Sequence, residues 1–289
     1  MQRAAIDPAA VEHFVPPERT PELLSGSVVA AEIAAAIRGA KRPLLLIGGG
    51  CHHPENREFL SRLMQAGIPA VVSLQGKGAI PEEVPYFAGM LGSYGNRSAN
   101  LAVSRADLLI VLGSRLDTRQ TGACREAFGD GRRLIQVDID AAEMAFHRLE
   151  NREIYAAALA EVLPCLAAHC DSIPVAQRWR DEVAQLKAQY SQLQEVERFV
   201  ANRLPYDVIN ALNDLTDADT VYLADIGQNQ MWAAQTLRLR SSQDFLTSGG
   251  MAPMGYAIPA AVGVAMACRD RRKVVAITGD GGLQIALQS

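Results

Sequence analysis

The feature that most constrains this fold is a series of short aliphatic runs, each ending in a turn and followed by a helical segment. Runs such as 43–47 and 107–112 are apolar without alternation, which is typical of strands buried on both faces. Because helical segments separate them, neighbouring strands are expected to run parallel. The sequence therefore predicts an α/β fold built on a doubly wound parallel sheet.

The first set of these elements predicts a Rossmann-like nucleotide-binding domain over residues 28–170, preceded by an N-terminal linker segment over 1–27. A polar helical stretch at 176–203 then interrupts the alternation, so residues 171–204 are expected to be a helical connector. The expected strands of the first domain are 43–47, 69–72, 107–112 and 133–137, and its expected helices are 29–38, 55–65 and 98–104.

The alternation restarts after Pro205 and predicts a second α/β domain over residues 205–289. The expected strands are 221–225, 244–248 and 273–278, and the expected helices are 206–215, one beginning near 228, and 255–268. The sequence ends soon after the third strand. Since an incomplete parallel sheet leaves apolar faces and edges uncovered, we expect this second domain to be truncated.

Composition favours a small-molecule partner. The chain has 289 residues and a net charge of only −4, so no broad field is available to hold nucleic acid or an anionic membrane. No apolar stretch reaches the ~20 residues of a membrane span, and no secretory signal is recognisable. Five scattered cysteines argue against a disulfide framework. We therefore expect a cytoplasmic protein with no nucleic-acid or membrane partner.

Four strand ends in the first domain carry residues suited to a nucleotide. Glycines 48–50 end the first strand, where missing side chains allow close approach of a ligand. Ligands of open α/β sheets bind outside the carboxyl ends of the strands, so the later turns should converge there. Arg115 and Arg119 supply positive charge for a diphosphate, and Asp138 or Asp140 is placed to bind ribose or ribityl hydroxyls.

Three glycine-bearing turns of the second domain favour a phosphate and its metal. They are Asp225–Asn229, Ser248–Gly255 and Thr278–Gly282, and each presents backbone amides at a strand end. The last turn also carries Asp280. This combination suits Mg²⁺, which takes one or two protein oxygens together with phosphate and water.

These motifs resemble acetolactate synthases of the thiamin diphosphate-dependent enzyme family. In the first domain the resemblance rests on LLLIGGGC, SLQGKGAIP, GMLGSYGNRSANLAVSRADLLIVLGSRLDTRQTG and LIQVDIDAAEM, and in the second on DIGQNQMWAAQ, FLTSGGMAPMGYAIPAAVG and the GDG turn. The chain thus resembles the family's central domain followed by the opening of its diphosphate-binding domain.

In that family the central domain holds FAD, which has a structural role in carboligation. The resemblance therefore implies FAD-binding residues Gly48, Gly49, Gly50, Ser73, Leu74, Gln75, Leu91, Gly92, Ser93, Tyr94, Gly113, Arg115, Asp117, Arg119, Asp138, Ile139 and Glu143. The family commonly has Met-His where this chain has Ser93–Tyr94, and a second Asp where it has Thr118. Relatives in the wider superfamily bind ADP or nothing there, so ADP remains an alternative ligand.

The resemblance also implies a thiamin diphosphate site in the second domain, with Mg²⁺ bound by Asp280. The implied cofactor-binding residues are Gly227, Gln228, Asn229, Met254, Gly279, Asp280, Gly281 and Gly282. Met254 would lie under the cofactor, and Asn229 stands where the synthases usually have His. Met231 and Trp232 are expected to be core residues without a chemical role.

The implied reaction decarboxylates a 2-oxo acid such as pyruvate and transfers the two-carbon unit to a second carbonyl compound. In the family, an activating glutamate comes from the pyrimidine-binding domain of a neighbouring subunit, so the resemblance implies a homodimer or homotetramer. We expect this chain to lack such a domain and therefore to be inactive alone. Two alternatives stay open: another thiamin diphosphate-dependent decarboxylase or lyase on the same scaffold, or a non-catalytic nucleotide-binding module.

Overall fold

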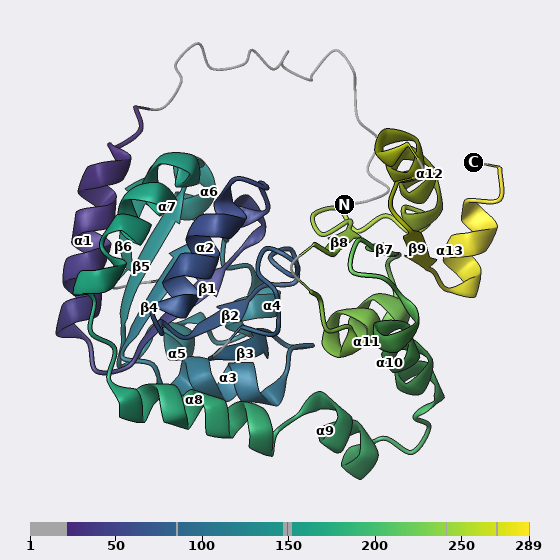
Figure 1. Cartoon of the computed structure of the whole chain (residues 1–289), viewed down its shortest axis with the longest axis horizontal. Helices are drawn as coiled ribbons and strands as arrows, with labels where there is room; N and C mark the ends of the chain where they lie inside the picture. Colours follow the sequence, from purple (N-terminus) through teal and green to yellow (C-terminus); the bar gives the residue numbers. More distant parts are fainter. Residues whose placement is uncertain are drawn as a thin grey trace, which may run out of the picture.

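The computed structural model describes residues 22–84, 86–146, 149, 152–240, 242–269 and 271–288, and it contains two parallel β-sheets (Figure 1). Every strand pair recorded in either sheet is parallel. The predicted α/β class with parallel sheets is therefore confirmed. No helix in this described part of the chain is long and apolar enough to cross a membrane.

The first sheet has six strands in the order β3-β2-β1-β4-β5-β6. The chain adds strands on one side of β1 and then returns to continue from β4 on its other side. The carboxyl ends of β1 and β4 thus form a topological switch point, where ligands of such sheets bind. The strands are β1 (Pro43–Ile47), β2 (Ala70–Val72), β3 (Phe87–Met90), β4 (Leu108–Leu112), β5 (Arg133–Asp138) and β6 (Arg152–Ala156).

Apolar helix faces cover this sheet. Helix α1 buries Val29, Ile33 and Ile37, which share one face because they are four residues apart. Helices α1 and α2 both pack against α7, while α3 packs against β3. The helices of this part are α1 (Gly26–Gly39), α2 (Asn56–Gln65), α3 (Arg97–Arg105), α4 (Thr118–Thr121), α5 (Arg125–Gly129), α6 (Ala141–Phe146) and α7 (Leu159–Ala168), with short 3₁₀ turns at Gly49–Cys51 and Cys170–Ser172.

Two helices, α8 (Gln177–Gln189) and α9 (Gln192–Phe199), join the two sheets. The single polar stretch expected here is divided after Tyr190, whose backbone leaves the helical region. Helix α8 packs against α3 and β3, and the indole nitrogen of its buried Trp179 donates to the Pro43 carbonyl at 2.8 Å. The connecting segment is therefore anchored firmly on the first sheet.

The second sheet has three strands, β8-β7-β9, with β7 in the middle. Helix α12 packs on β7 and β9, and α11 packs against α10. The elements are α10 (Leu204–Leu215), β7 (Val221–Ala224), α11 (Gln228–Thr236), β8 (Asp244–Thr247), α12 (Ala257–Cys268), β9 (Val274–Ile277) and α13 (Asp280–Ile285).

Specific contacts hold the second sheet and its helices beside the first. Arg57 on α2 forms an ion pair with Asp244 at the start of β8. The buried Lys77 pairs with Glu82 and also donates to the Leu237 carbonyl at 2.8 Å. These contacts bring the loops that follow β7 and β8 close to the carboxyl edge of the first sheet.

Candidate functional site

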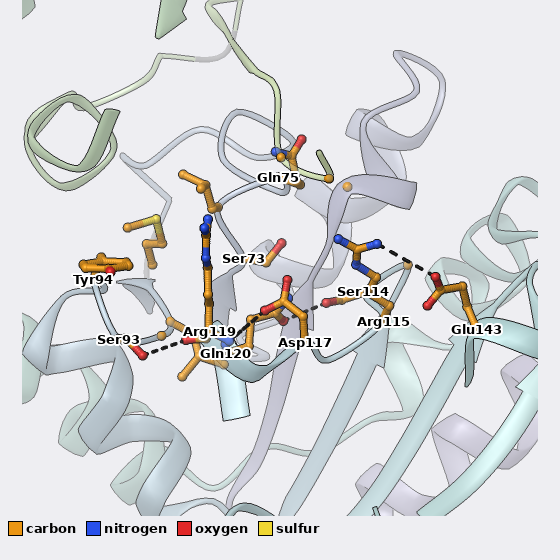
Figure 2. A pocket seen from close by; sticks show the side chains of 18 of the residues that line it. Ser73, Gln75, Ser93, Tyr94, Ser114, Arg115, Asp117, Arg119, Gln120 and Glu143 are labelled. Carbon is orange, nitrogen blue, oxygen red and sulfur yellow. Dashed lines mark hydrogen bonds and ion pairs between the residues drawn. The ribbon is translucent and has the colours of Figure 1, made fainter. Parts of the chain in front are cut away.

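A cavity of about 360 Å³ opens at the carboxyl edge of the first sheet. Loops that follow β1 to β5 supply most of its wall (Figure 2). Its size falls within the range of ordinary ligand sites. The cavity therefore lies where the strand order predicts a nucleotide.

The cavity brings together most of the residues expected at the first site. Those that line it are Gly49, Ser73, Leu74, Gln75, Leu91, Gly92, Ser93, Tyr94, Gly113, Arg115, Asp117, Arg119, Asp138, Asp140 and Glu143. Gly48, Gly50 and Ile139 are not among the lining residues, and the Ile139 side chain is exposed. The lining residues that the sequence reasoning did not assign to this site are Met90, Ser114, Gln120, Met231, Gly249 and Gly250.

Gly48 and Gly50 allow the turns after β1 and β4 to approach each other. A Cβ atom on Gly48 would lie 2.2 Å from the carbonyl oxygen of Gly113. A Cβ atom on Gly50 would lie 2.9 Å from the Cα atom of Gly113. The Gly50 amide donates to that carbonyl at 2.9 Å. Gly113 itself has φ +63°, a conformation that favours glycine. These glycines shape the floor of the cavity by close backbone packing.

The loop after β4 is held in place by its own polar groups. The carboxylate of Asp117 accepts hydrogen bonds from the Arg119 and Gln120 amides at 3.0 and 3.3 Å, as a helix N-cap does. The Ser114 hydroxyl donates to the Gln120 side chain at 2.7 Å. Leu116 has φ +57°, a strained conformation for a branched residue that is common at ligand sites. The loop thus presents Arg115 and Arg119 at the cavity from a fixed backbone.

One end of the cavity is acidic. Burial raises the pKa of the Asp138 carboxyl, and repulsion by Asp140 and Glu143 adds to the effect, while backbone hydrogen bonds from residues 139 and 140 oppose it. A guanidinium nitrogen of Arg115 lies 3.9 Å from a carboxylate oxygen of Glu143 across this end (Figure 2). Carboxylates held in this way can accept hydrogen bonds from ligand hydroxyl groups.

The other end is apolar and includes a residue of the second body, the name used here for the second sheet with helices α10 to α13; the first body is the first sheet with helices α1 to α7. Met90, Leu91 and Tyr94 come from the first body, and Met231 comes from α11. Met231, which was expected to be a core residue without a chemical role, is only partly buried and lies in the cavity wall, where the docking of α11 places it. No sequence pattern predicts such a contact, since it depends on how the two bodies pack. Trp232 instead packs edge-on against Tyr206, with ring centroids 6.2 Å apart.

A second cluster lies at the carboxyl ends of β7 and β9, where Asp225 organises the turns. Its buried carboxylate accepts hydrogen bonds from the Ile226 amide at 2.7 Å, the Gly255 amide at 3.0 Å and the Thr278 hydroxyl at 3.1 Å. One side chain thus ties all three glycine-bearing turns together. The position directly after a strand is the only sequence signal for this role.

The residues expected at the second site gather around these turns. Asn229 donates to the Ile277 carbonyl at 3.1 Å, which joins the start of α11 to the end of β9. A Cβ atom on Gly281 would lie 3.0 Å from the terminal methyl group of Met254. The structure therefore brings together Gly227, Gln228, Asn229, Met254, Gly279, Asp280, Gly281 and Gly282.

These groups fit part of a diphosphate and metal site. Gly227 has φ +143° at the start of α11, a conformation that favours glycine, whose missing side chain leaves the backbone uncovered. The Asp280 carboxylate is exposed and accepts a hydrogen bond from the Gly281 amide at 2.8 Å. A lone carboxylate beside phosphate oxygens is sufficient protein ligation for Mg²⁺. Among the described residues, no group of three or more His, Cys, Asp and Glu side chains could hold a metal without such a phosphate.

Comparison with protein families matches both parts of the chain. Residues 30–166 match the family described as thiamine pyrophosphate enzyme, central domain. Residues 225–289 match the thiamine pyrophosphate enzyme, C-terminal TPP binding domain.

Similar proteins include acetolactate synthase large subunits. Isozyme 1 of Escherichia coli is 37% identical over 261 residues, covering 89% of this chain and 44% of that protein. The large subunit of Pyropia yezoensis is 35% identical over 260 residues, covering 88% of this chain and 43% of that protein. A probable large subunit of Methanocaldococcus jannaschii is 32% identical over 274 residues, covering 92% of this chain and 46% of that protein. The chain thus spans less than half the length of these relatives.

Proposed function

Because this chain belongs to the thiamine pyrophosphate enzymes, we propose that it serves an acetolactate synthase-like carboligase. The reaction would decarboxylate a 2-oxo acid such as pyruvate and transfer the two-carbon unit to a second carbonyl compound. The observation that carries this proposal is the pairing of two different strand-end sites in one chain. The similarity to acetolactate synthase large subunits supports the choice of reaction.

The first cavity would hold FAD. Its two ends differ in chemistry, with carboxylates and Arg115 at one and Met90, Tyr94 and Met231 at the other. FAD has a matching arrangement, because the large flat isoalloxazine ring and its ribityl chain lie on one side of the diphosphate and adenosine lies on the other. ADP would use only the polar end. The apolar end is therefore what favours FAD over ADP.

The second cluster would hold thiamin diphosphate and Mg²⁺. Gly227, Gly279 and Gly281 would place backbone amides around the diphosphate, Asp280 would bind the metal, and Met254 would support the cofactor from below. When bound, thiamin diphosphate supplies the carbon nucleophile of the reaction. The role of Asp225 is to hold the three turns at a fixed spacing.

The working enzyme would be a homodimer or homotetramer in the cytoplasm, in which the pyrimidine-binding domain of a neighbouring subunit completes the site. Support for a further packing surface comes from α12. This helix is apolar on all sides, yet of its residues only Ala257 is buried, and Val262 on α12 and Ile285 on α13 are exposed. Helices apolar all round are normally buried.

Binding measurements on the purified chain test the two sites. We expect calorimetric titration to detect FAD with higher affinity than ADP, and thiamin diphosphate only when Mg²⁺ is present. Stabilisation by ADP with no preference for FAD would instead indicate a plain nucleotide-binding module. Failure of both cofactors to bind would refute the assignment of both sites.

A chimera tests the reaction. Replacing the matched region of the Escherichia coli isozyme 1 large subunit with this chain would retain the rest of that protein. We expect the chimera to form acetolactate from pyruvate when FAD, thiamin diphosphate and Mg²⁺ are supplied. A chimera that binds the three cofactors but forms no acetolactate would point to another reaction on the same scaffold.

A further inference from the structure

A polar side chain is buried in the middle of the first sheet. Gln136 lies in β5 between the buried Ile135 and Val137, and it is fully buried itself. An amide in such a place is costly unless both of its ends find partners. The Gln136 nitrogen donates to the Ser114 carbonyl at 2.7 Å, and the Gln136 oxygen accepts a hydrogen bond from the Arg152 guanidinium at 2.6 Å. Gln136 therefore links β6 to the loop that follows β4.

The Ser114 end of this link reaches the first cavity. Ser114 directly precedes Arg115, and both residues line the cavity. The Ser114 hydroxyl donates to the side chain of Gln120, another lining residue, at 2.7 Å (Figure 2). Because Gln136 holds the Ser114 carbonyl, it fixes the backbone from which the Arg115 side chain projects.

Arg152 also contacts the opposite wall of the polar end. A second guanidinium nitrogen of Arg152 donates to the carbonyl of Met144, which is buried in α6. Met144 directly follows Glu143, whose carboxylate oxygen lies 3.9 Å from a guanidinium nitrogen of Arg115. The donors of a guanidinium lie in a rigid planar fork. One Arg152 side chain thus ties the loop that carries Arg115 to the helix that carries Glu143.

We propose that Arg152 is a positioning residue that holds Arg115 and Glu143 at a fixed spacing at the polar end of the first cavity. This inference rests on the proposed nucleotide site and deepens it, since Arg152 lies on β6 and is not one of the residues that line the cavity. FAD and ADP would both use the polar end, so both should depend on Arg152.

Calorimetric titration of FAD and ADP into variants of the full chain tests this role. For Arg152→Met we expect the affinity for both nucleotides to fall by roughly three- to tenfold, the size of an effect carried through intervening residues. Arg152→Lys should lie in between, because one ammonium group does not reproduce the fork. Gln136→Glu keeps an acceptor for Arg152 but has no donor for the Ser114 carbonyl. It should therefore weaken both nucleotides even where stability is retained.

The matched control is Arg133→Met. Arg133 also joins β5 to β6, through two hydrogen bonds to the Glu153 carboxylate at 2.6 and 2.8 Å, but neither residue lines the cavity. We expect this variant to bind FAD and ADP as the unaltered chain does. Urea unfolding of each variant establishes that a loss of binding does not come from unfolding.

A double-mutant cycle adds a readout that a merely structural role would not change. If Arg152 acts by placing Arg115, then Arg152→Met should cost less affinity in an Arg115→Met background than in the unaltered chain. A residue that only stabilises the fold would cost the same affinity in both backgrounds. Equal costs would therefore contradict the positioning role.

The remaining outcomes separate this role from the proposed function. If the unaltered chain binds FAD and ADP, but Arg152→Met and Gln136→Glu bind them as tightly, the positioning role is wrong and the nucleotide site stands. If Arg133→Met weakens binding as much as Arg152→Met, the effect belongs to the pairing of β5 with β6, and the role is also wrong. If the unaltered chain binds neither nucleotide, the proposed site and the positioning role both fail. Should Arg152→Met not fold, Gln136→Glu decides.

Discussion

In the first sheet β1 and β4 are buried along their whole length, whereas every residue of β9 in the second sheet is partly exposed. Both regions use the same local device, a parallel strand that ends in a glycine-bearing turn. In the first region these turns border a cavity of about 360 Å³, which neighbouring strands and residues from the second sheet's loops and helices help to close. The contrast teaches that strand-end turns define where a ligand site lies, while the surrounding layers determine how closed it is.

The strongest test of this contrast is a pair of matched core truncations. Ile110 lies in β4 and is fully buried, and Ile277 lies in β9 and is partly exposed. We expect Ile110→Ala to lower the free energy of unfolding by about 2–5 kcal/mol and Ile277→Ala to lower it by less, since less apolar surface is lost from the interior. Urea unfolding measures the free energy of unfolding of both variants. Equal losses would mean that the second sheet is as well packed as the first.

Close packing of the turns can be tested with a matched pair of glycines. A Cβ atom on Gly48 would collide with the backbone of Gly113, whereas one on Gly39 would meet nothing within 4 Å. We expect Gly48→Ala to lower the free energy of unfolding by about 1–3 kcal/mol, as overpacking does, and to weaken FAD binding. Gly39→Ala should be neutral or slightly stabilising. If both variants unfold at the same urea concentration, the turns after β1 and β4 do not need this close approach.

In the second region the corresponding test removes the charge that ties the turns together. Asp225→Asn keeps the shape of the side chain but weakens acceptance from the Gly255 amide and the Thr278 hydroxyl. We expect a loss of stability on the order of 1–2 kcal/mol, together with weaker binding of thiamin diphosphate and Mg²⁺ in a calorimetric titration. Asp219→Asn, at an exposed position, is the control. Unchanged cofactor binding in Asp225→Asn would show that Asp225 does not organise the turns for the cofactor.

The smallest expected effect concerns pH at the acidic end of the first cavity. The pKa of Asp138 is raised from its ordinary 3.8, chiefly by burial. If its carboxylate accepts a ligand hydroxyl, FAD affinity should fall as the pH is lowered through this raised pKa, at higher pH than for an ordinary Asp. The same shift means that protonation of Asp138 favours the folded state in the window between 3.8 and the raised pKa. Titrations of FAD at decreasing pH should show the loss in the unaltered chain and a smaller loss in Asp138→Asn.

Much of the fold could be predicted because its buried strands are purely aliphatic. The expected strand at 43–47 coincides with β1, and that at 244–248 extends one residue beyond β8. Two strands were not expected. The edge strand β6 carries Arg152 and Glu153, so it lacks an apolar pattern, and β3 contains a positive-φ glycine at position 89 and a register shift against β2. Helix α7 was also missed, since Pro164 interrupts its helical pattern.

The first site was predictable to the extent that it depends on strand ends. Residues such as Gln75, Arg115 and Asp138 follow different strands, and a parallel sheet places all their carboxyl ends on one edge. Met231 and Gly249 could not be found in this way. They reach the cavity through docking of the second body, which involves residues far apart in the sequence, such as Arg57 and Asp244.

The most direct test of the account is a crossed binding experiment on the two sites. FAD and thiamin diphosphate with Mg²⁺ are titrated into the unaltered chain, Gly48→Ala and Asp280→Ala. We predict that Gly48→Ala weakens only FAD and that Asp280→Ala weakens only the Mg²⁺-dependent binding of thiamin diphosphate. Competition between the two cofactors in the unaltered chain, or loss of both in Asp280→Ala, would contradict two separate sites.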